Sequence, residues 1–522
     1  MFLRSLRTSI ATARRFSAAT ASSAAAEKAL TRGAGTKNDG VAGGSSGRDT
    51  LGRRLLSLVY SKRSAVIAIS KWREEGRTVR KFELSRVVKE LRKLRRYKHA
   101  LEICEWMTKQ KDIKLQAGDY AVHLDLVAKV RGINSAEKFF EDMPGSMADH
   151  STYSALLNSY VQNNLSDKAE ALMEKMLKCS FVRNPLPYNH MISLYLSNGQ
   201  LEKIHEVIRE LMKHTTPDVL TYNLWIAACA KQHDVKTAEK VFRMLKEAKL
   251  DPDWVTYSSL TNLYMKSGLT EKAASTLKEM EKMVSRKNRV AYSSLLSLHT
   301  NTGDKDAVRR IWKKMKSTFR KMNDAEYHCM ISSLLKLEEL KEAEDLYSEW
   351  ESVSGTNDSR IPNLLLAAYI NRDQMGMAET FYKRIFQKDM AASYTTYELL
   401  TWGYLKQKKV ETVLVNFKNA VNSVAKWDPD EKFVRKVFEL IEELGSVEGA
   451  EQLLATLRKV GYVTTGIYNS LLRTYAKAEK MPLLIEERMG KDKVQLDEDT
   501  HELLKLTSKM CVSEVSSSFL KP

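Results

Sequence analysis

The stretch VLTYNLWIAACAKQHDVKTAEKVFRMLKEAKLDPD, residues 219–253, is followed without a break by WVTYSSLTNLYMKSGLTEKAASTLKEMEKMVSRKN, residues 254–288. Both stretches open with two apolar residues and Thr-Tyr, and both are 35 residues long. A phrase that returns at a fixed interval of this size is typical of a protein built from stacked repeats. The structure of one such unit therefore decides the fold of most of the chain.

Each unit contains two amphipathic helices, because its apolar residues recur at spacings of three and four. A turn such as TPD or DPD ends the unit, where proline stops the second helix and the acidic residue can cap the next one. The unit is therefore a helical hairpin. In residues 219–253 the apolar face of the first helix consists of Tyr222, Ile226 and Cys229, and that of the second of Ala238, Val241, Phe242 and Leu245.

Two further positions support the hairpin. The fifteenth residue is of a type that tolerates the left-handed conformation ending a helix, and five positions later a small residue lets two helices approach closely. The fifteenth residues are Asn164, Gly199, His233, Gly268 and Gly303, and the small residues are Ala169, Ala238, Ala273, Ala343 and Ala378.

One hairpin cannot cover its own apolar stripe, so neighbouring hairpins must stack and share a core. We therefore predict an all-α fold, a right-handed α-solenoid superhelix of about twelve 35-residue helical hairpins with a long concave surface. The units are predicted to start at Phe82, Ala117, His150, Pro185, Val219, Trp254, Arg289, Asp324, Ser359, Tyr394, Asp430 and Thr465, with a fragment from Thr500.

The segments outside the repeats have distinct compositions. Residues 1–26 contain Arg, Ser and Ala and no acidic residue, which predicts an organellar transit peptide. The phrase ARRFSAAT resembles a mitochondrial processing site, so we predict a mitochondrial protein. A chloroplast location is the alternative, and a merely disordered basic tail is a third interpretation. We predict a flexible Gly/Ser/Ala linker for residues 27–52 and a basic helical N-terminal cap for residues 53–81. We predict the solenoid for residues 82–499, and a C-terminal cap and tail for residues 500–522.

The net charge of +19 is concentrated near the N-terminus. Residues 1–116 contain 27 lysines and arginines against 10 acidic residues. Such a concentration can neutralise phosphates, but a solvated helix face explains the charge equally well.

No motif for catalysis, metal or cofactor binding occurs in the sequence. The five cysteines form no CxxC pair, and there is no HExxH, GxxxxGK or glycine-rich phosphate loop. The residues after Asp499 are too few for the zinc site of a deaminase. No apolar run is long enough to cross a membrane. We therefore expect no enzyme, no cofactor, no metal, no small-molecule substrate and no membrane insertion.

The phrase VLTYNLWIAACAKQHDVKTAEKVFRMLKEAKLDPD resembles a pentatricopeptide repeat of the P-type found in plant organelles. The resemblance covers about residues 82–499 and is strongest between residues 150 and 323. It implies binding of single-stranded organellar RNA along the concave surface, with one nucleotide at each repeat.

The resemblance also implies that the fifth and the last residue of a repeat address the edge of a base, and that the second residue stacks against it. Ser with Asn suggests adenine and Asn with Asp suggests uracil, so the five central repeats suggest A-U-U-A-A from the 5′ end. The central pairs are Ser154 with Asn184, Asn189 with Asp218, Asn223 with Asp253, Ser258 with Asn288, and Ser293 with Asn323. Two later pairs are Asn363 with Ser393, for a pyrimidine, and Asn469 with Asp499, for uracil. The stacking residues are Leu186, Leu220, Val255 and Val290.

Two alternatives remain open. Asp or Asn before a helix is ordinary capping, and Ser or Asn in a first turn is unremarkable. The other repeats fit no pairing, which keeps open a structural protein, such as a scaffold or subunit of the mitochondrial ribosome or of another assembly with ribosomal or RNA-processing proteins. The unmatched pairs are Arg86 with Gln116, Ala121 with Asp149, His328 with Asp358, Glu398 with Pro429, and Val434 with Thr464, and the unmatched second residues are Glu83, Arg360, Glu431 and Gly466.

Overall fold

The computed structural model describes residues 49–58, 64–285, 288–353, 358–387 and 390–518. The predicted transit peptide, residues 1–26, and all but the last four residues of the predicted linker lie outside the described residues. The described part contains α-helices, one 3-10 turn at Gly145–Met147 and no strand, which confirms the predicted α-solenoid class. It divides into two units, one ending at Val284 and one beginning at Ser285.

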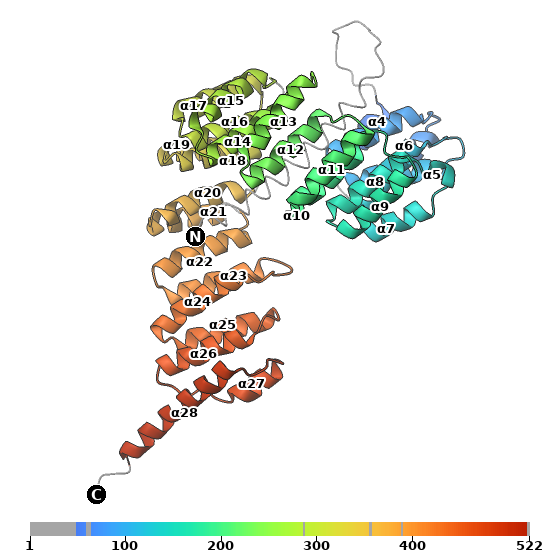
Figure 1. Ribbon diagram of the computed structural model, residues 1–522. Coiled ribbons are helices and arrows are strands. Elements are labelled where there is room, and N and C mark those ends of the chain that lie inside the picture. The colour runs from blue at the N-terminus through green and yellow to red at the C-terminus, as the bar shows by residue number, and fades with distance from the viewer. Residues whose placement is uncertain (1–48, 59–63, 286–287, 354–357, 388–389, 519–522) are drawn as a thin grey trace. The chain divides into compact units, whose positions relative to one another are not determined.

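Helices of the first unit pair into hairpins in chain order (Figure 1). Hairpin α2–α3 comes first, and six further hairpins follow it in the described part of this unit, from α4–α5 to α14–α15. The bounds are α2 Leu51–Leu56, α3 Ala65–Glu74, α4 Lys81–Lys93, α5 Tyr97–Lys109, α6 Ala117–Arg131, α7 Ile133–Glu141, α8 His150–Gln162, α9 Ser166–Lys178, α10 Leu186–Asn198, α11 Leu201–His214, α12 Val219–Gln232, α13 Val235–Glu247, α14 Trp254–Lys266 and α15 Thr270–Met283.

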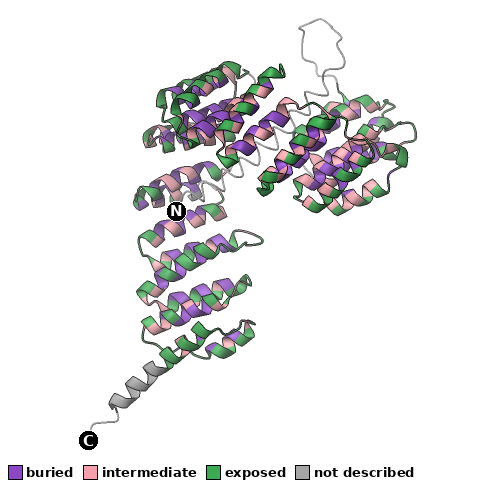
Figure 2. Ribbon diagram, in the orientation of Figure 1, coloured by how far each residue is buried: buried purple, intermediate pink, exposed green. Residues whose placement is uncertain are grey.

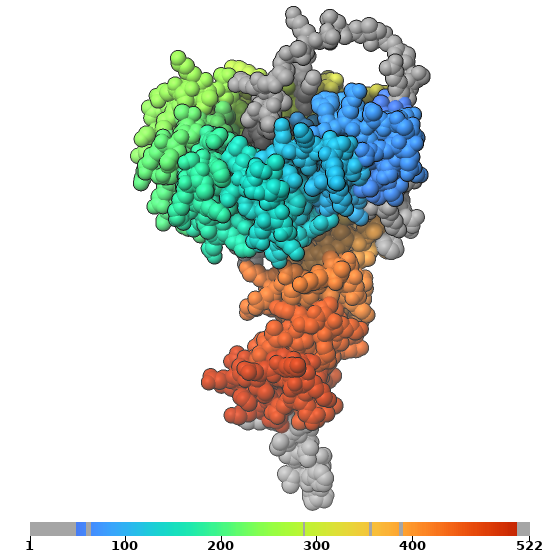
Figure 3. All heavy atoms as spheres, turned by 90° about the vertical axis from the view of Figure 1, so that its right-hand side faces the viewer, coloured from blue at the N-terminus to red at the C-terminus, as the bar shows by residue number. Residues whose placement is uncertain are grey.

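The second unit continues the same pattern from hairpin α16–α17 to α26–α27 and ends with α28. In the space-filling view the colours within this unit succeed one another in bands, as expected when each hairpin contacts its neighbours in sequence (Figure 3). The bounds are α16 Arg289–Thr302, α17 Lys305–Thr318, α18 Asp324–Lys336, α19 Leu340–Val353, α20 Arg360–Asn371, α21 Met375–Gln387, α22 Tyr394–Lys406, α23 Val410–Asn422, α24 Glu431–Leu444, α25 Val447–Lys459, α26 Thr465–Lys477, α27 Ile485–Lys491 and α28 Glu498–Ser518.

Within each unit the first helices of successive hairpins contact one another, as α6 contacts α8 and α16 contacts α18. The second helices contact mainly the first helices of their own and of the next hairpin. A stack curves toward its more closely spaced layer, so the first helices lie on the inner side of each unit. We call these even-numbered helices, α4 to α14 and α16 to α28, the inner row.

The apolar faces pack as the sequence pattern predicts. Buried residues line the helix faces that meet neighbouring helices, and exposed residues face outward (Figure 2). The five alanines predicted at close helix approaches are all fully buried. They are Ala169, Ala238, Ala273, Ala343 and Ala378.

The predicted left-handed turn between the two helices of a hairpin is present, with φ of 55° at Asn164, 75° at Gly199 and 58° at His233. The turn also recurs where the residue is not one that favours this conformation. A side chain in this region costs about 1 kcal/mol, so the hairpin geometry imposes the turn. The further left-handed residues of this kind are Glu338, Asp373, Lys408 and Glu479.

A polar clasp joins neighbouring hairpins. The Glu239 carboxylate on α13 accepts hydrogen bonds from the Tyr264 hydroxyl on α14, at 3.3 Å, and from Lys272 Nζ on α15, at 2.7 Å. The same geometry recurs along the stack, so each second helix is tied to the hairpin that follows it. Other glutamates in this position are Glu170 with Tyr195 and Lys203, Glu344 with Tyr369, Glu379 with Tyr404, and Glu451 with Tyr475 and Arg488.

Candidate nucleic-acid interface

The last residue of most central units caps the next helix of the inner row. Its side-chain oxygen accepts a hydrogen bond from a backbone N–H of the first turn, which satisfies a donor that has no partner within the helix. Capping therefore explains why Asp, Asn and Ser occur there. The bonds join Asn184 Oδ1 to Leu186 N (3.0 Å), Asp218 Oδ1 to Thr221 N (2.8 Å), Asp253 Oδ1 to Thr256 N (3.0 Å), Asn288 Oδ1 to Ala291 N (3.1 Å), Asn323 Oδ1 to Glu326 N (3.0 Å) and Ser393 Oγ to Thr396 N (3.4 Å).

In the two Asn–Asp repeats the structure joins the paired residues directly. Asn189 Nδ2 donates to Asp218 Oδ1 at 3.0 Å, and Asn223 Nδ2 donates to Asp253 Oδ1 at 3.0 Å. A buried threonine at the third position of the next helix completes each group. Thr221 Oγ1 lies 2.8 Å from Asn189 Oδ1. This threonine was missed by sequence reasoning, although it is the Thr of the repeated Thr-Tyr phrase.

This arrangement fixes which polar atoms are already engaged in hydrogen bonds. Every hydrogen bond that the described part of the chain makes to the Asp218 carboxylate ends on Oδ1, and the same holds for Asp253. Oδ2 of each aspartate is left as an acceptor. Each asparagine amide has two N–H groups and uses one on its aspartate. The pair therefore presents one acceptor beside one donor.

The Ser–Asn repeats are built differently. Ser154 Oγ donates to His150 O at 2.7 Å, and Ser293 Oγ donates to Arg289 O at 3.3 Å, so each hydroxyl proton is directed to its own helix. In the described residues neither serine bonds to its predicted partner, Asn184 or Asn323. The serine oxygen keeps its capacity to accept a hydrogen bond, and the asparagine amide its capacity to donate one. Ser258 and Asn288 belong to different units.

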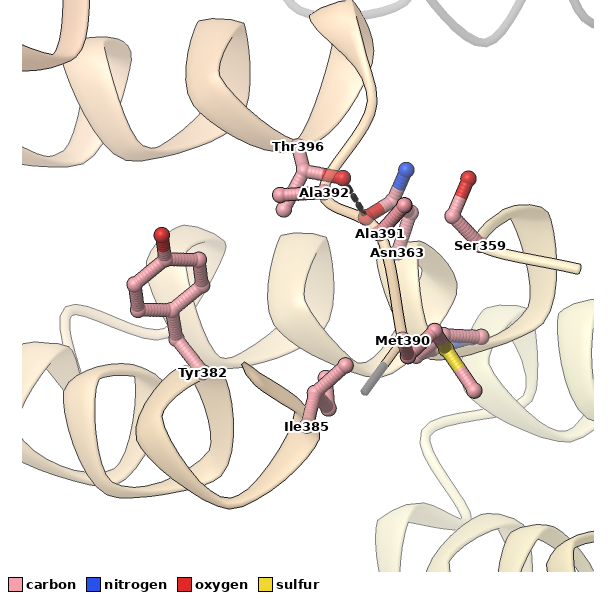
Figure 4. Close-up of a pocket in the computed structure, with 9 residues that line it drawn as sticks. Ser359, Asn363, Tyr382, Ile385, Met390, Ala391, Ala392 and Thr396 are labelled. Carbon is pink, nitrogen blue, oxygen red and sulfur yellow. Dashed lines mark hydrogen bonds between the residues drawn. The ribbon is translucent and has the colours of Figure 1, made fainter. Parts of the chain in front are cut away.

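The pair Asn363 and Ser393 is also joined, with Asn363 Nδ2 3.3 Å from Ser393 Oγ. Thr396 Oγ1 donates to Asn363 Oδ1 at 2.9 Å, the contact drawn in Figure 4. A cavity of about 10 Å³, lined by Ser359, Asn363 and Met390 among others, lies beside the amide. That volume suits one water molecule at most, so no ligand larger than water fits beneath this pair.

The predicted partner of Asn469 is wrong. Asn469 Nδ2 donates to Asp497 Oδ1 at 3.1 Å, and Asp497, not Asp499, is the N-cap of α28. Thr500 Oγ1 donates to Asn469 Oδ1 at 2.7 Å, which makes Thr500 the third residue of its helix and not the first. The register shifts by two residues because α27 is only seven residues long.

Four other predicted repeat starts are off by one residue. Helix α10 begins at Leu186 rather than Pro185, and α20 begins at Arg360 rather than Ser359. Helix α4 begins at Lys81 rather than Phe82, and α24 begins at Glu431 rather than Asp430. Asp430 is therefore the cap that corresponds to Glu398, in place of Pro429. The corrected fifth residues, in place of Arg86 and Val434, are Ser85 and Arg435. The apolar residues near these two helix starts indicate the corrected register. They are Leu84, Phe433 and Val434, and all three are buried.

The predicted stacking residues lie in the first turns of their helices. Leu186, Leu220 and Val255 are half-buried, and Val290 is 47% exposed. Apolar side chains that remain partly open at equivalent places are available for contact with a flat ligand.

Charges near the inner row are mostly paired within the chain. Lys81 Nζ lies 2.6 Å from Asp119, and Arg92 lies 2.8 Å from Asp125. Ion pairs therefore join the basic N-terminal region to the rest of the fold.

One acidic group near the inner row is strongly perturbed. Burial and the nearby Asp430 carboxylate raise the pKa of Glu398 to about 7.

The described residues hold no group of three or more His, Cys, Asp or Glu placed to bind a metal ion. None of their helices is both long and apolar enough to cross a membrane.

Comparison with known proteins gives consistent matches. The family model described as the PPR repeat family matches residues 217–263, and the pentatricopeptide repeat domain model matches residues 171–232. The single PPR repeat model matches residues 151–181, 255–283, 290–317 and 327–353.

Full-length relatives are also similar. A mitochondrial pentatricopeptide repeat-containing protein of Arabidopsis thaliana is 59% identical over 99% of this chain and 99% of its own length. A second mitochondrial one from the same plant is 34% identical over 81% of this chain and 86% of its own length.

Among solved structures, the crystal structure of the maize pentatricopeptide repeat protein PPR10 has a TM-score of 0.35 and 18% identity, covering 83% of this chain and 66% of that one. The structure of yeast Rmd9p in complex with a 16-nucleotide target RNA has a TM-score of 0.41 and 11% identity, covering 82% of this chain and 96% of that one.

Proposed function

This chain belongs to the pentatricopeptide repeat family, and on that premise we propose that it binds single-stranded RNA along its inner row. Like its relatives it is a mitochondrial protein, as predicted. The observation that carries the proposal is the pairing of Asn189 with Asp218 and of Asn223 with Asp253, in which Oδ2 of the aspartate and one N–H of the asparagine take part in no hydrogen bond within the described residues.

The donor–acceptor pattern supports the base assignments. Uracil presents an N–H between two carbonyl oxygens, so its N–H suits aspartate Oδ2 and a carbonyl suits the asparagine N–H. Adenine presents an amino group beside a ring nitrogen, so the amino group suits serine Oγ and the nitrogen suits the asparagine amide of a Ser–Asn pair. The five central repeats therefore favour A-U-U-A-A.

Within the second unit the pairs are less regular. Asn469 with Asp497 repeats the joined Asn–Asp geometry and favours uracil, and Asn363 with Ser393 favours a pyrimidine. We take the biological effect to be occupancy: bound protein blocks nucleases, competing RNA structures or ribosomes, and so affects the stability, processing or translation of a transcript without catalysis.

The decisive experiment compares two short RNAs that differ only at the uracils. The purified full chain is titrated into labelled RNA containing AUUAA or ACCAA, because cytosine reverses the donor and acceptor of uracil at the same size. About tenfold weaker binding for each replaced base is expected. Equal affinity for both RNAs would refute base reading.

A swapped variant provides the matched control. In Asn189→Ser combined with Asp218→Asn, the second pair acquires the Ser–Asn form while the helix cap is kept. This variant is expected to prefer AAUAA over AUUAA. A variant that still prefers AUUAA would show that other residues select the base.

A structural role in a protein assembly is the second candidate, and a groove on the outer side favours it. The groove has a volume of about 550 Å³ and lies between α5 and α7 over α6, with Lys109 and Lys138 exposed at its edges and His123 buried at its base. Sedimentation of the tagged protein separates the candidates. Stable migration with ribosomal subunits after RNase treatment would favour the assembly role.

A further inference from the structure

The connection between the inner-row helices α18 and α20, in the second unit, carries an arginine two residues after its capping aspartate. We call this connection a step of the inner row. By register its reading residues are His328, the fifth residue of α18, and Asp358, which precedes α20. The second residue, where four central repeats carry Leu or Val, is Arg360.

Arg360 occupies both oxygens of Asp358. Its Nε lies 2.9 Å from Oδ1 and 3.0 Å from Oδ2, and its Nη2 lies 2.5 Å from Oδ2. The Arg360 backbone N–H adds a bond of 3.0 Å to Oδ1. In the Asn–Asp repeats, by contrast, the intramolecular bonds leave Oδ2 outward. The carboxylate that would select a base here is already engaged by a fixed, two-pronged donor.

The exposures of the two partners show which of them faces a ligand. The Asp358 side chain is 16% exposed and the Arg360 side chain 72% exposed. A planar guanidinium held in place by a carboxylate offers one flat face, and bases of every kind stack on such a plane. Its remaining N–H groups are donors suited to a phosphate oxygen.

His328 adds no selection of its own. Burial lowers the pKa of its ring, which favours the neutral imidazole. A neutral imidazole has one donor and one acceptor nitrogen and exchanges them by changing tautomer. It therefore meets either a donor or an acceptor on the base edge.

Building on the proposed RNA binding, we propose that Arg360 makes this repeat a non-selective step: it locks Asp358 and stacks on whichever base occupies the position. The step counts one nucleotide and keeps the neighbouring repeats in register, but it does not read that nucleotide. Because the five central repeats precede it, the bound RNA has the form AUUAANY, where N is any base and Y a pyrimidine.

Four RNAs of sequence AUUAANU, differing only at N, test this with the full chain. The wild type should bind all four within about twofold. Arg360→Leu restores the side chain found at this place in other repeats and releases Asp358, so it should separate the best from the worst base by about tenfold. Arg372→Leu is the matched control, because Arg372 is an exposed arginine at the end of the same helix that bonds to Glu338 O on the preceding hairpin. It should behave as the wild type does.

Two results would overturn the inference. One is a wild type that already prefers one base at N by more than about fivefold, and the other is an Arg360→Leu variant as indifferent as the wild type. Failure of all four RNAs to bind would overturn the proposed function itself, and this inference with it. Arg360 is largely exposed, so its replacement leaves the packed core unchanged.

Discussion

Replacing Thr256 by valine should weaken base selection at the Asn223–Asp253 pair without changing its charge. Thr256 is fully buried, and its Oγ1 lies 2.6 Å from Asn223 Oδ1 and 3.1 Å from Asp253 Oδ1. The single hydroxyl proton goes to the shorter contact, so it holds the Asn223 amide with its oxygen inward and one N–H outward. Valine has the same shape and cannot donate.

The magnitude follows from the groups left without partners. In Thr256→Val the buried Asn223 Oδ1 loses its donor, and the Asp253 backbone N–H loses the acceptor that lies 3.1 Å away. Leaving such groups unsatisfied costs about 1–3 kcal/mol. The amide then rotates more freely, and the preference for uracil over cytosine at this nucleotide should fall from about tenfold to about threefold.

The assay is a pair of titrations, AUUAA against AUCAA, with the urea midpoint of each variant measured beside it. Thr261→Val is the matched control, because Thr261 is equally buried on the same helix but its hydroxyl bonds only to Tyr257 O at 2.8 Å. It should lower the midpoint slightly and leave the base preference intact. If Thr256→Val kept full discrimination, or Thr261→Val lost as much, the threonine would not position the reading amide.

Two predictions concern stability. A Glu398 carboxyl with a pKa raised from its ordinary value to about 7 binds a proton more tightly in the folded chain than in the unfolded one, so its contribution to stability is full below the ordinary carboxyl pKa and is lost as pH rises through about 7. Glu398→Gln should therefore match the wild type in thermal melts at pH 5 and exceed it at pH 8, and parallel pH profiles would contradict this. Ala238 is fully buried where two helices meet, so Ala238→Leu should destabilise the chain by about 1–3 kcal/mol in urea unfolding, whereas Ala248→Leu, at an exposed position on the same hairpin, should not; equal midpoints would show that the contact is loosely packed.

The sequence was sufficient for the hairpin and its repetition, because both depend on local periodicity. Apolar spacing, the alanine contacts and the left-handed turn all derive from residues within one unit, and the structure reproduces them. Residue preferences could not predict the left-handed conformation at Glu338 and Lys408, since the geometry of the hairpin imposes it.

The register of individual repeats was less predictable. The interval between inner-row helices depends on the length of the second helix and its loop, which carries no fixed pattern. Asp497 and Asp499 are both acidic and lie two residues apart, so composition alone could not decide which one caps α28. The same limitation shifted the starts of α4 and α24.

The bonds within each pair were also outside sequence reasoning. The repeat period places Asn189 at the fifth and Asp218 at the last position of one unit. Only the structure shows that they bond to each other and share Thr221. In the sequence, Arg360 only departs from the aliphatic residue expected at the second position. The structure shows that its side chain contacts both carboxylate oxygens of Asp358.

The proposed dual use of the capping residues, as helix caps and as base readers, bears on how such a protein changes its target. Asn, Asp and Ser all begin a helix well, and their codons differ by one or two letters. A mutation among them at Asn184, Asp218 or Asn288 leaves the helix start satisfied while altering the outward chemistry. Drift between RNA targets can therefore proceed by point mutations that the fold tolerates, and new specificities arise without a passage through unstable ancestors.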